Sequence, residues 1–265
     1  MAEKKFEGQR ALVTGSTRGL GETIAKRLAE EGAWVVVTGR DAVNVERVTG
    51  EIRAAGGKAD GAPADLSAPT EARRLGEAAL GILGRLDILV NNAGMSIREP
   101  VWAISEERLD YQLNVDFRSY FILAQIAARS MIPRRSGRIV NISTNGAFQA
   151  HPMTAVYDSA KGAVESFTRC LATELGRFNI CANAISPGYV PYRPGAEGDI
   201  HSQYPMDETI PLRRFGTADD IANAVLFFCG PESAWISGQV LSVDGGRLAR
   251  LSVPPQPEPP PDPDF

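Results

Sequence analysis

Residues 11–28 constrain the fold of this chain more than any other segment. The apolar run Ala11-Leu12-Val13 leads into the loop Thr14-Gly15-Ser16-Thr17-Arg18-Gly19-Leu20-Gly21, and apolar residues at helical spacing follow as far as Leu28. A strand that turns through glycines into a helix lets a pyrophosphate approach bare backbone at the positive end of the helix. Many glycine-rich loops are simple turns, but here a strand and a helix flank the loop as a dinucleotide site requires. The segment therefore predicts an α/β protein that binds a dinucleotide.

Apolar runs and amphipathic helical patterns alternate along the rest of the chain. Further strands are expected at residues 34–37, around 59–64, and at 86–90, 138–142, 180–185 and 239–243. Helices are expected at residues 41–52, where Asp41 can be the N-cap, and at 70–83, 105–129, 157–175 and from 219 onward. Such alternation is typical of a doubly wound parallel sheet with helices on both faces. The predicted fold class is therefore α/β, of the Rossmann type.

Composition excludes several classes of function. The net charge is −4 with both signs interspersed, which argues against a nucleic-acid-binding protein. No apolar run approaches the roughly 18 residues of a membrane span, and the N-terminus lacks the apolar core of a signal peptide. Cys170, Cys181 and Cys229 show no C-x-x-C pattern and are expected to be free thiols in a reducing compartment. His151 and His201 are too few for a metal site. A cytoplasmic protein with a small-molecule partner is expected, with no nucleic acid, membrane or metal.

Two segments lack the periodicity of a helix or strand. Residues 189–211 are rich in proline, and a loop of this length is usually functional, so it is predicted to be a substrate lid. Residues 254–265 are proline-rich and acidic and are expected to form an extended tail. The chain is predicted to hold one dinucleotide-binding domain, residues 1–253, followed by this tail.

A candidate proton-transfer site comprises Ser143, Tyr157 and Lys161. If Tyr157 lies near the start of a helix, Lys161 is one turn further along the same face. A nearby ammonium favours phenolate and lowers the pKa of a phenol from about 10. Ser143 follows an expected strand, so its hydroxyl can hold a carbonyl oxygen beside the tyrosine. Tyr-x-x-x-Lys pairs are also common surface contacts, but this set can move a proton on or off an alcohol oxygen.

Basic residues mark the place where the adenosine ribose of a dinucleotide should lie. Gly39-Arg40 follows the second expected strand, and Arg18 lies in the glycine loop. An acid at this place binds a ribose 2′-hydroxyl, whereas an arginine suits a 2′-phosphate. The pattern predicts NADP(H) in preference to NAD(H), and the alternative is that both arginines are merely solvated. Asp65 is placed to reach the adenine amine.

Other polar residues are candidates for packing or for the substrate pocket. Asn114 lies inside an expected helix, although asparagine is a poor helix former, so a functional role is considered for it. The alternative is that its side-chain amide is buried in the core and hydrogen-bonded there. The substrate pocket is expected to include Ser96, Ser143, Asn145, His151, Met153, Tyr157 and Tyr189. This mixture suggests a medium-sized, partly apolar ketone or alcohol.

Taken together, the motifs resemble those of the short-chain dehydrogenase/reductase family, in its single-domain branch, over about residues 6–246. The resemblance rests on TGSTRGLG at 14–21, Asp65-Leu66, NNAG at 91–94, Asn114, Ser143, Tyr157-x-x-x-Lys161, Ser186-Pro187-Gly188 and VDGG at 243–246. Each piece is weak, but the ordered set is highly specific. The resemblance implies a seven-stranded parallel sheet and a homotetramer, with a homodimer as the alternative.

The resemblance also implies roles for individual residues. Tyr157 would be the general acid/base, Ser143 would orient the carbonyl, Lys161 would hold the nicotinamide ribose and lower the tyrosine pKa, and Asn114 would support a water relay. Cofactor contacts would come from Gly15, Ser16, Thr17, Arg18, Gly19, Leu20, Gly21, Arg40, Asp65, Leu66, Asn92, Ala93, Gly94, Tyr157, Lys161, Pro187, Gly188 and Val190. One departure is Tyr192, which stands where the family usually has a threonine that contacts the nicotinamide end of the cofactor.

The expected function is transfer of a hydride between NADP(H) and a ketone or secondary alcohol, with Tyr157 as the general acid/base. Two alternatives remain open, a non-catalytic NADP(H)-binding scaffold and a redox-neutral lyase or epimerase on the same fold. The intact Tyr157–Lys161 pair disfavours the scaffold, because a binding module has no need of it. A conversion without net cofactor turnover would identify the lyase or epimerase.

Overall fold

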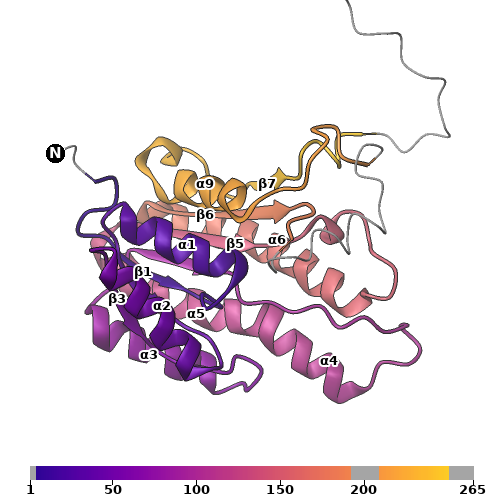
Figure 1. The fold of residues 1–265 in the computed structure, drawn as a ribbon, viewed down its shortest axis with the longest axis horizontal. Helices are drawn as coiled ribbons and strands as arrows, with labels where there is room; N and C mark the ends of the chain where they lie inside the picture. Colours follow the sequence, from indigo (N-terminus) through magenta and orange to yellow (C-terminus); the bar gives the residue numbers. More distant parts are fainter. Residues whose placement is uncertain (1–3, 192–208, 251–265) are drawn as a thin grey trace, which may run out of the picture.

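The computed structural model describes residues 4–191 and 209–250, and a seven-stranded parallel sheet runs through them (Figure 1). The strand order is β3-β2-β1-β4-β5-β6-β7. The strands are β1 (Arg10–Val13), β2 (Trp34–Val37), β3 (Lys58–Gly61), β4 (Ile88–Asn91), β5 (Gly137–Ile142), β6 (Ile180–Pro187) and β7 (Val240–Val243). This is the Rossmann arrangement, and the predicted fold class is confirmed.

The strand order reverses at β1. Val13 of β1 lies opposite Val37 of β2 on one side and opposite Val90 of β4 on the other. The chain builds the sheet outward from β1 to β3 and then returns to the other side of β1. A crevice opens at such a reversal, outside the carboxyl ends of the strands, and this is where ligands bind in open α/β sheets.

Helices cover both faces of the sheet (Figure 1). One face carries α1 (Gly19–Glu30), α2 (Ala42–Ala54) and α9 (Ala218–Cys229), and the other carries α3 (Glu71–Leu83), α5 (Ser119–Met131) and the carboxyl half of α6 (Ala155–Leu175). Alternate strand residues face opposite layers, since Val13 packs in the first core and Leu12 in the second. The central strands are therefore buried on both faces, which explains their continuous apolar runs. Among the described residues, no helix is both long enough and apolar enough to cross a bilayer.

A single long helical run connects the cleft to the second helical layer. It consists of α4 (Glu106–Leu113), one widened π-helical turn η1 (Asn114–Arg118) and α5. Ser105 caps its start by accepting a hydrogen bond from the Arg108 amide at 3.4 Å. The predicted helix at residues 105–129 is thus found, but its period changes at Asn114. Single π turns inside helices often occur at functional sites.

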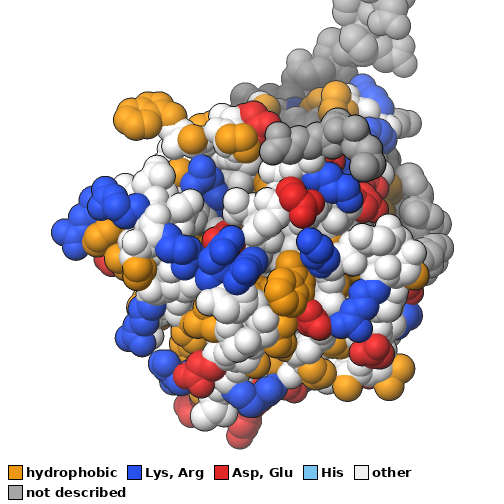
Figure 2. All heavy atoms as spheres, turned by 90° about the vertical axis from the view of Figure 1, so that its left-hand side faces the viewer, with side chains coloured by type: hydrophobic (Ala, Val, Ile, Leu, Met, Phe, Trp, Pro, Cys, Tyr) orange, Lys and Arg blue, Asp and Glu red, His pale blue; other side chains and the backbone are white. Residues whose placement is uncertain are grey.

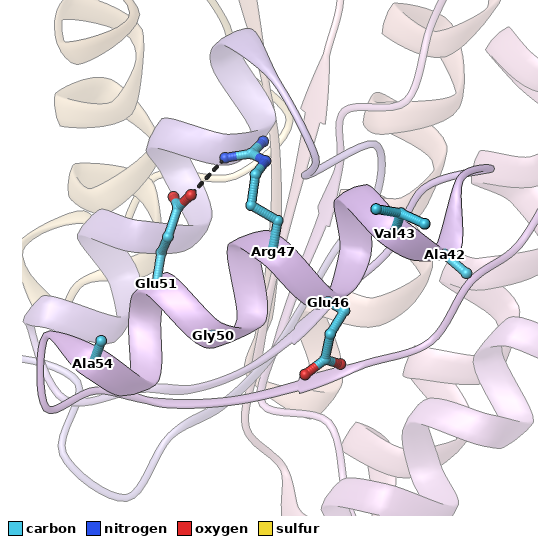
Figure 3. Close-up of a pocket in the computed structure, with 7 residues that line it drawn as sticks. All are labelled: Ala42, Val43, Glu46, Arg47, Gly50, Glu51 and Ala54. Atoms are coloured by element: carbon cyan, nitrogen blue, oxygen red, sulfur yellow. Dashed lines mark hydrogen bonds and ion pairs between the residues drawn. The ribbon is translucent and has the colours of Figure 1, made fainter.

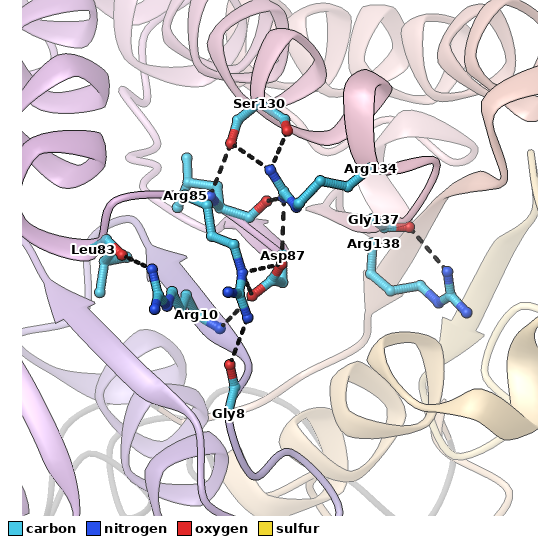
Figure 4. Close-up of polar contacts among 10 residues, drawn as sticks. Gly8, Arg10, Leu83, Arg85, Asp87, Ser130, Arg134, Gly137 and Arg138 are labelled. Atoms are coloured by element: carbon cyan, nitrogen blue, oxygen red, sulfur yellow. Dashed lines mark hydrogen bonds and ion pairs between the residues drawn. The ribbon is translucent and has the colours of Figure 1, made fainter.

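The amino-terminal edge of the sheet is held by a cluster around Asp87, at the end of the strands remote from the crevice. The Asp87 carboxylate accepts from the Arg10 amide at 3.0 Å, from Arg85 Nε at 3.0 Å and from Arg134 Nη2 at 3.3 Å (Figure 4). The view toward this end shows Lys and Arg side chains gathered across its middle (Figure 2). One carboxylate therefore ties β1, the turn before β4 and the segment after α5 together.

Candidate active site

A cleft of about 920 Å³ opens at the carboxyl ends of the strands, where the strand order reverses. Most of the predicted cofactor residues line it, from the glycine loop at one end to Tyr157 at the other. The predicted residues in its wall are Gly15, Thr17, Arg18, Gly19, Leu20, Gly21, Arg40, Asp65, Leu66, Asn92, Ala93, Gly94, Ser96, Ser143, Tyr157, Lys161, Pro187, Gly188 and Val190. Residues far apart in the sequence thus converge on one concave surface.

Hydrogen bonds fix the glycine loop to the neighbouring strand ends. The buried Ser16 hydroxyl donates to the Val13 carbonyl at 2.7 Å and accepts from the Thr38 amide at 2.9 Å. Ser16 was expected to contact the cofactor, but its hydroxyl is used inside the protein. At Gly15, which has φ of 62°, a Cβ would lie 2.9 Å from the Cα of Ala93. The backbone of the glycine loop therefore packs directly against the backbone of the segment after β4.

The other wall of the cleft, the segment after β4, is clamped to the same loop. Thr14 Oγ1 accepts from the amides of Asn92 at 2.8 Å and Ala93 at 2.9 Å. In turn, Asn92 Nδ2 donates a hydrogen bond to the Thr14 carbonyl at 2.8 Å. Asn92 and Ala93 thus shape the cleft through their backbone, as the expected close packing requires.

Three arginines surround one end of the cleft, where the sequence predicted two. Arg18 and Arg40 are exposed, and Arg40 donates to the Tyr111 hydroxyl at 2.9 Å. The third is Arg47 of α2, which lines the same cleft and donates from Nη2 to the Thr17 carbonyl at 2.9 Å. Arg47 was missed because it is distant from both motifs in sequence. It also forms ion pairs with Glu22 and Glu51 at 2.9 Å.

A buried polar atom supports a dinucleotide at this end. Thr38 is 1% exposed and lines the cleft, and its Oγ1 has no hydrogen-bond partner among the described residues. Buried hydroxyls normally have a partner, so this one fits a polar ligand in the cleft. Together with the glycine loop at the N-terminus of α1, it fits the phosphate-bearing half of a nicotinamide dinucleotide.

A second depression lies on the outer side of α2 and has a different character (Figure 3). All its lining residues come from that one helix, namely Ala42, Val43, Glu46, Arg47, Gly50, Glu51 and Ala54. A ligand site needs polar groups that converge from several elements. The only polar contact drawn among these residues is the Arg47–Glu51 pair, so we assign no function to this depression.

Lys161 lies at the opposite end of the cleft from the arginines and is 1% exposed. Its ammonium donates to the Tyr120 hydroxyl at 2.9 Å and to the Ile142 carbonyl at 3.0 Å. It also pairs with the Asp116 carboxylate at 3.4 Å and lies 5.8 Å from the centre of the Tyr157 ring. The predicted helical pair is therefore formed, with Lys161 buried and Tyr157 partly exposed in the cleft wall.

Burial dominates the acidity of Tyr157. Desolvation raises the pKa of Tyr157 to about 12, against opposing effects of the Lys161 ammonium and a hydrogen bond with the Thr144 side chain. The Asp116 carboxylate adds to the increase. We expected the ammonium to lower this pKa towards neutrality. The ammonium does act in that direction, but the cost of burying a phenolate is larger.

The hydroxyl that acts on Tyr157 belongs to Thr144, whereas the sequence predicts Ser143 in this role. Ser143 Oγ donates to Glu165 Oε1 at 2.7 Å, while the Thr144 side chain acts on Tyr157 and lowers its pKa. The backbone is extended at Thr144, with φ of −159° and ψ of 153°. Neighbouring side chains on extended backbone point to opposite sides. Only one of two consecutive hydroxyls can therefore face Tyr157, and the structure corrects the prediction by one residue.

Asn114 and Asn145 both serve as anchors. Asn114 Nδ2 donates to the Ser67 carbonyl at 3.0 Å, which ties the π-helical turn to the loop after β3. Asn145 is 1% exposed; it donates to Asp244 Oδ2 at 3.0 Å and accepts from Ser186 Oγ at 2.9 Å. The predicted substrate contact at Asn145 is therefore wrong in this structure, because its amide joins the turn after β5 to the end of β7.

The other predicted substrate residues lie in surface segments outside the cleft wall. His151 donates from its backbone amide to Asp158 at 2.8 Å, and its Nδ1 lies 3.2 Å from the same carboxylate. Met153 is 48% exposed, and the Tyr189 ring packs edge-on against Phe215. Residue Tyr192, most of the predicted lid and the proline-rich tail lie outside the described residues, so those predictions remain untested.

Comparisons with known proteins identify relatives over nearly the whole chain. The family model described as Enoyl-(Acyl carrier protein) reductase matches residues 15–247. The chain is 36% identical over 249 residues to the 3-oxoacyl-[acyl-carrier-protein] reductase FabG of Aquifex aeolicus, a match that covers 93% of this chain and 100% of the relative.

Solved structures are similar over nearly the whole chain. A short-chain type dehydrogenase/reductase from Mycobacterium ulcerans has a TM-score of 0.86 at 29% identity, covering 93% of this chain and 92% of the other. A 7 alpha-hydroxysteroid dehydrogenase complexed with NADH and 7-oxo glycochenodeoxycholic acid also has a TM-score of 0.86, at 33% identity, covering 94% and 98%. These matches and the shared motifs show that the chain belongs to the short-chain dehydrogenase/reductase family.

Proposed function

We propose that this protein is an NADP(H)-dependent oxidoreductase that interconverts a ketone and a secondary alcohol. The observation that carries the proposal is the single cleft that joins the glycine loop to Tyr157, Thr144 and Lys161. A nicotinamide bound there supplies or accepts the hydride, which no side chain can do. The residues of this chain then have to hold the carbonyl and move one proton.

Tyr157 and Thr144 are the groups that would hold the carbonyl oxygen. Both hydroxyls donate to this oxygen as negative charge develops on it, and the Tyr157 phenol passes its proton to it. The buried Lys161 ammonium stabilises the phenolate that remains. Asn114 contributes as an anchor, since it fixes the turn behind Lys161 to Ser67.

The raised pKa of Tyr157, about 12, favours reduction at neutral pH. The phenol is then protonated across the physiological range and is ready to act as an acid. Oxidation of the alcohol needs the phenolate, so its rate should increase with pH towards that pKa, while the rate of reduction falls only as the phenol loses its proton.

Preference for NADP(H) is supported by the charges at the arginine end of the cleft. Arg18, Arg40 and Arg47 all line it. The acid nearest to Arg40 in sequence, Asp41, is already used, because its carboxylate accepts from the Val43 amide at 2.9 Å and caps α2. Similar structures have been solved with NADH and with NADPH, so the fold alone does not decide the cofactor, and the side chains at this end of the cleft have to decide it.

The proposal is tested by supplying NADPH with a panel of ketones and following both the cofactor and the substrate. An oxidoreductase consumes NADPH and ketone in equal amounts. A scaffold would bind NADPH without oxidising it, and a lyase or epimerase would convert its substrate with no net loss of NADPH. Either of these last results would overturn the proposal.

Thr144 should matter more than Ser143. We expect Thr144→Val to lower kcat/KM for ketone reduction by about 10²-fold, because it removes one donor to the developing oxyanion. Thr144→Ser keeps the hydroxyl and should retain most of the activity. Ser143→Ala is the control, and less than a tenfold change is expected from it. A loss in Ser143→Ala as large as that in Thr144→Val would contradict the assignment of this role to Thr144 alone.

We also propose that the protein forms homo-oligomers, in line with the homotetramer expected from its family. An aromatic cluster lies on the outer side of α5 and α6, where Phe121 stacks on Phe167 at 4.9 Å and is still 47% exposed. Phe117 packs against the same Phe167 ring. Exposed apolar clusters of this kind mark association surfaces. Phe121→Glu should dissociate the assembly in light scattering, and an unchanged mass would exclude this face from the interface.

A further inference from the structure

A carboxylate that the proposed chemistry does not use is buried against Lys161. Asp116 is fully buried, and its Oδ1 lies 3.4 Å from the Lys161 ammonium. Oδ1 also accepts from the Met95 amide at 3.3 Å, and Oδ2 accepts from Gln112 Nε2 at 3.3 Å. A carboxylate that gives up all contact with water in this way is costly unless it is paired.

The pair lies directly beneath the wall of the cofactor cleft. A Cβ placed on Gly94 would be 2.8 Å from Asp116 Oδ1 and 3.4 Å from Lys161 Nζ. Gly94 itself lines the cleft. The backbone at Gly94 therefore packs directly against the ion pair. The hydrogen bond from the Met95 amide to Asp116 also links the pair to this wall of the cleft. The π-helical turn brings Asp116 to this place, because it widens the helix where the wall and α6 meet.

Few titratable groups face this pair in the described part of the chain. The pair consists of Asp116 from η1 and Lys161 from α6, and the groups nearest to it are the phenols of Tyr157 from α6 and Tyr120 from α5. Burial raises the pKa of Tyr120 well above its usual value, so this phenol is neutral. Glu165 lies one turn beyond Lys161 and is hydrogen-bonded to Ser143. The Asp116 charge therefore offsets the Lys161 charge close to Tyr157.

We infer that Asp116 is a positioning residue that acts on Tyr157 through Lys161. Its carboxylate holds the ammonium beneath Gly94 and weakens the ability of that ammonium to stabilise the Tyr157 phenolate. This inference rests on the proposed function, in which Tyr157 exchanges a proton with the substrate. It makes the acidity of the reacting phenol depend on a carboxylate that touches neither substrate nor cofactor.

The ionisation of Asp116 adds a pH dependence of its own. Burial raises the pKa of Asp116 to about 6, although the Lys161 ammonium opposes the increase. The carboxylate is therefore mostly ionised at neutral pH. As the pH falls below about 6 it takes up a proton, and its opposition to the Lys161 charge is lost.

The test compares the pH profiles of two variants that each remove one partner of Lys161. Asp116→Asn removes the charge and nearly keeps the shape, so the rising limb of alcohol oxidation should move to lower pH by about one unit or more. Tyr120→Phe removes the hydrogen bond to Lys161 at 2.9 Å but no charge, and it should move that limb by less than half as much. Asp116→Glu keeps the charge and should stay closer to the unmodified enzyme.

Two results would overturn the inference. One is an unchanged pH profile in Asp116→Asn, and the other is an equal shift in Tyr120→Phe, which would indicate a merely structural role. If Asp116→Asn does not fold, Asp116→Ser removes the same charge, and the same shift is expected from it.

A second readout needs no substrate and separates this inference from the proposed function. The tyrosinate absorbance of the protein, minus that of its Tyr157→Phe counterpart, reports the ionisation of Tyr157 alone. The signal should appear at lower pH in Asp116→Asn than in the unmodified protein. If no ketone is reduced by any form, the proposed function fails while this titration still decides the role of Asp116.

Discussion

Tyr157→Phe is expected to lower kcat/KM for ketone reduction by about 10²–10⁴-fold, the usual contribution of a general acid. Phenylalanine keeps the ring beside Lys161 and removes only the hydroxyl that gives up the proton. The Thr144 hydroxyl remains, so the carbonyl can still be held while no side chain protonates it. Measurement of NADPH oxidation over a range of ketone concentrations would give kcat/KM.

Cofactor affinity provides the control for this variant. The Tyr157 hydroxyl acts on the substrate oxygen, whereas the glycine loop and the arginines lie at the other end of the cleft. Binding of NADPH, followed by its fluorescence, should therefore change by less than about threefold, well under 1.4 kcal/mol. Retention of most of the activity in Tyr157→Phe would remove Tyr157 from the chemistry.

Reversal of the cofactor preference is the second large effect. Arg18→Ala combined with Arg40→Asp removes two cations and adds an acid that can accept from a ribose 2′-hydroxyl. Charge-assisted hydrogen bonds contribute about 1.5–3 kcal/mol each, so the kcat/KM ratio of NADPH to NADH should fall by about 10²–10⁴-fold. The loss will be smaller at physiological salt, because both arginines are exposed and screened.

The acid belongs at position 40 because position 39 has no room for a side chain. A Cβ on Gly39 would lie 2.6 Å from Thr17 Cγ2, so Gly39→Asp would distort the glycine loop as well as change its charge. Arg53→Ala with Arg74→Ala is the matched control, since it removes two exposed arginines that ion-pair elsewhere. An unmodified enzyme that uses NADH equally well would show that the cluster of arginines does not bind a phosphate.

The sheet could be predicted from the sequence because its central strands are buried on both faces. Strand β2, for example, is one apolar run of four residues between turn signals, and the prediction matches it residue for residue. β3 was harder, since its four residues include Lys58 and Asp60 at the edge of the sheet. A strand is predicted best when it is buried on both faces, because all its residues are then apolar. An edge strand mixes polar and apolar residues, so its sequence pattern is weaker.

The site was predictable as a set of motifs but less so as a set of contacts. The glycine loop and the Tyr157–Lys161 pair are local in sequence, so spacing alone brings their members together. The choice between Ser143 and Thr144 depends on the direction of each side chain at a strand end, which residue types do not encode. Arg47 and Asp116 join the site through tertiary packing and a change of helical period, and neither has a local signature.

Asn145 illustrates the opposite error. A polar residue just after a strand near the reacting tyrosine suggested a substrate contact. In the structure both polar atoms of the Asn145 amide hydrogen-bond to protein side chains, those of Ser186 and Asp244. These two residues come from distant parts of the chain. Whether a buried amide is free or satisfied depends on the packing of three elements, and one sequence cannot show this.

Hydride transfer itself is measured with NADPH that carries deuterium at both positions of the reactive nicotinamide carbon. Ketone incubated with the unmodified protein is expected to give an alcohol with one deuterium at the former carbonyl carbon, one for each NADPH oxidised, whereas Tyr157→Phe is expected to give almost no product. Product without deuterium, or conversion without loss of NADPH, would contradict hydride transfer from NADPH to the ketone.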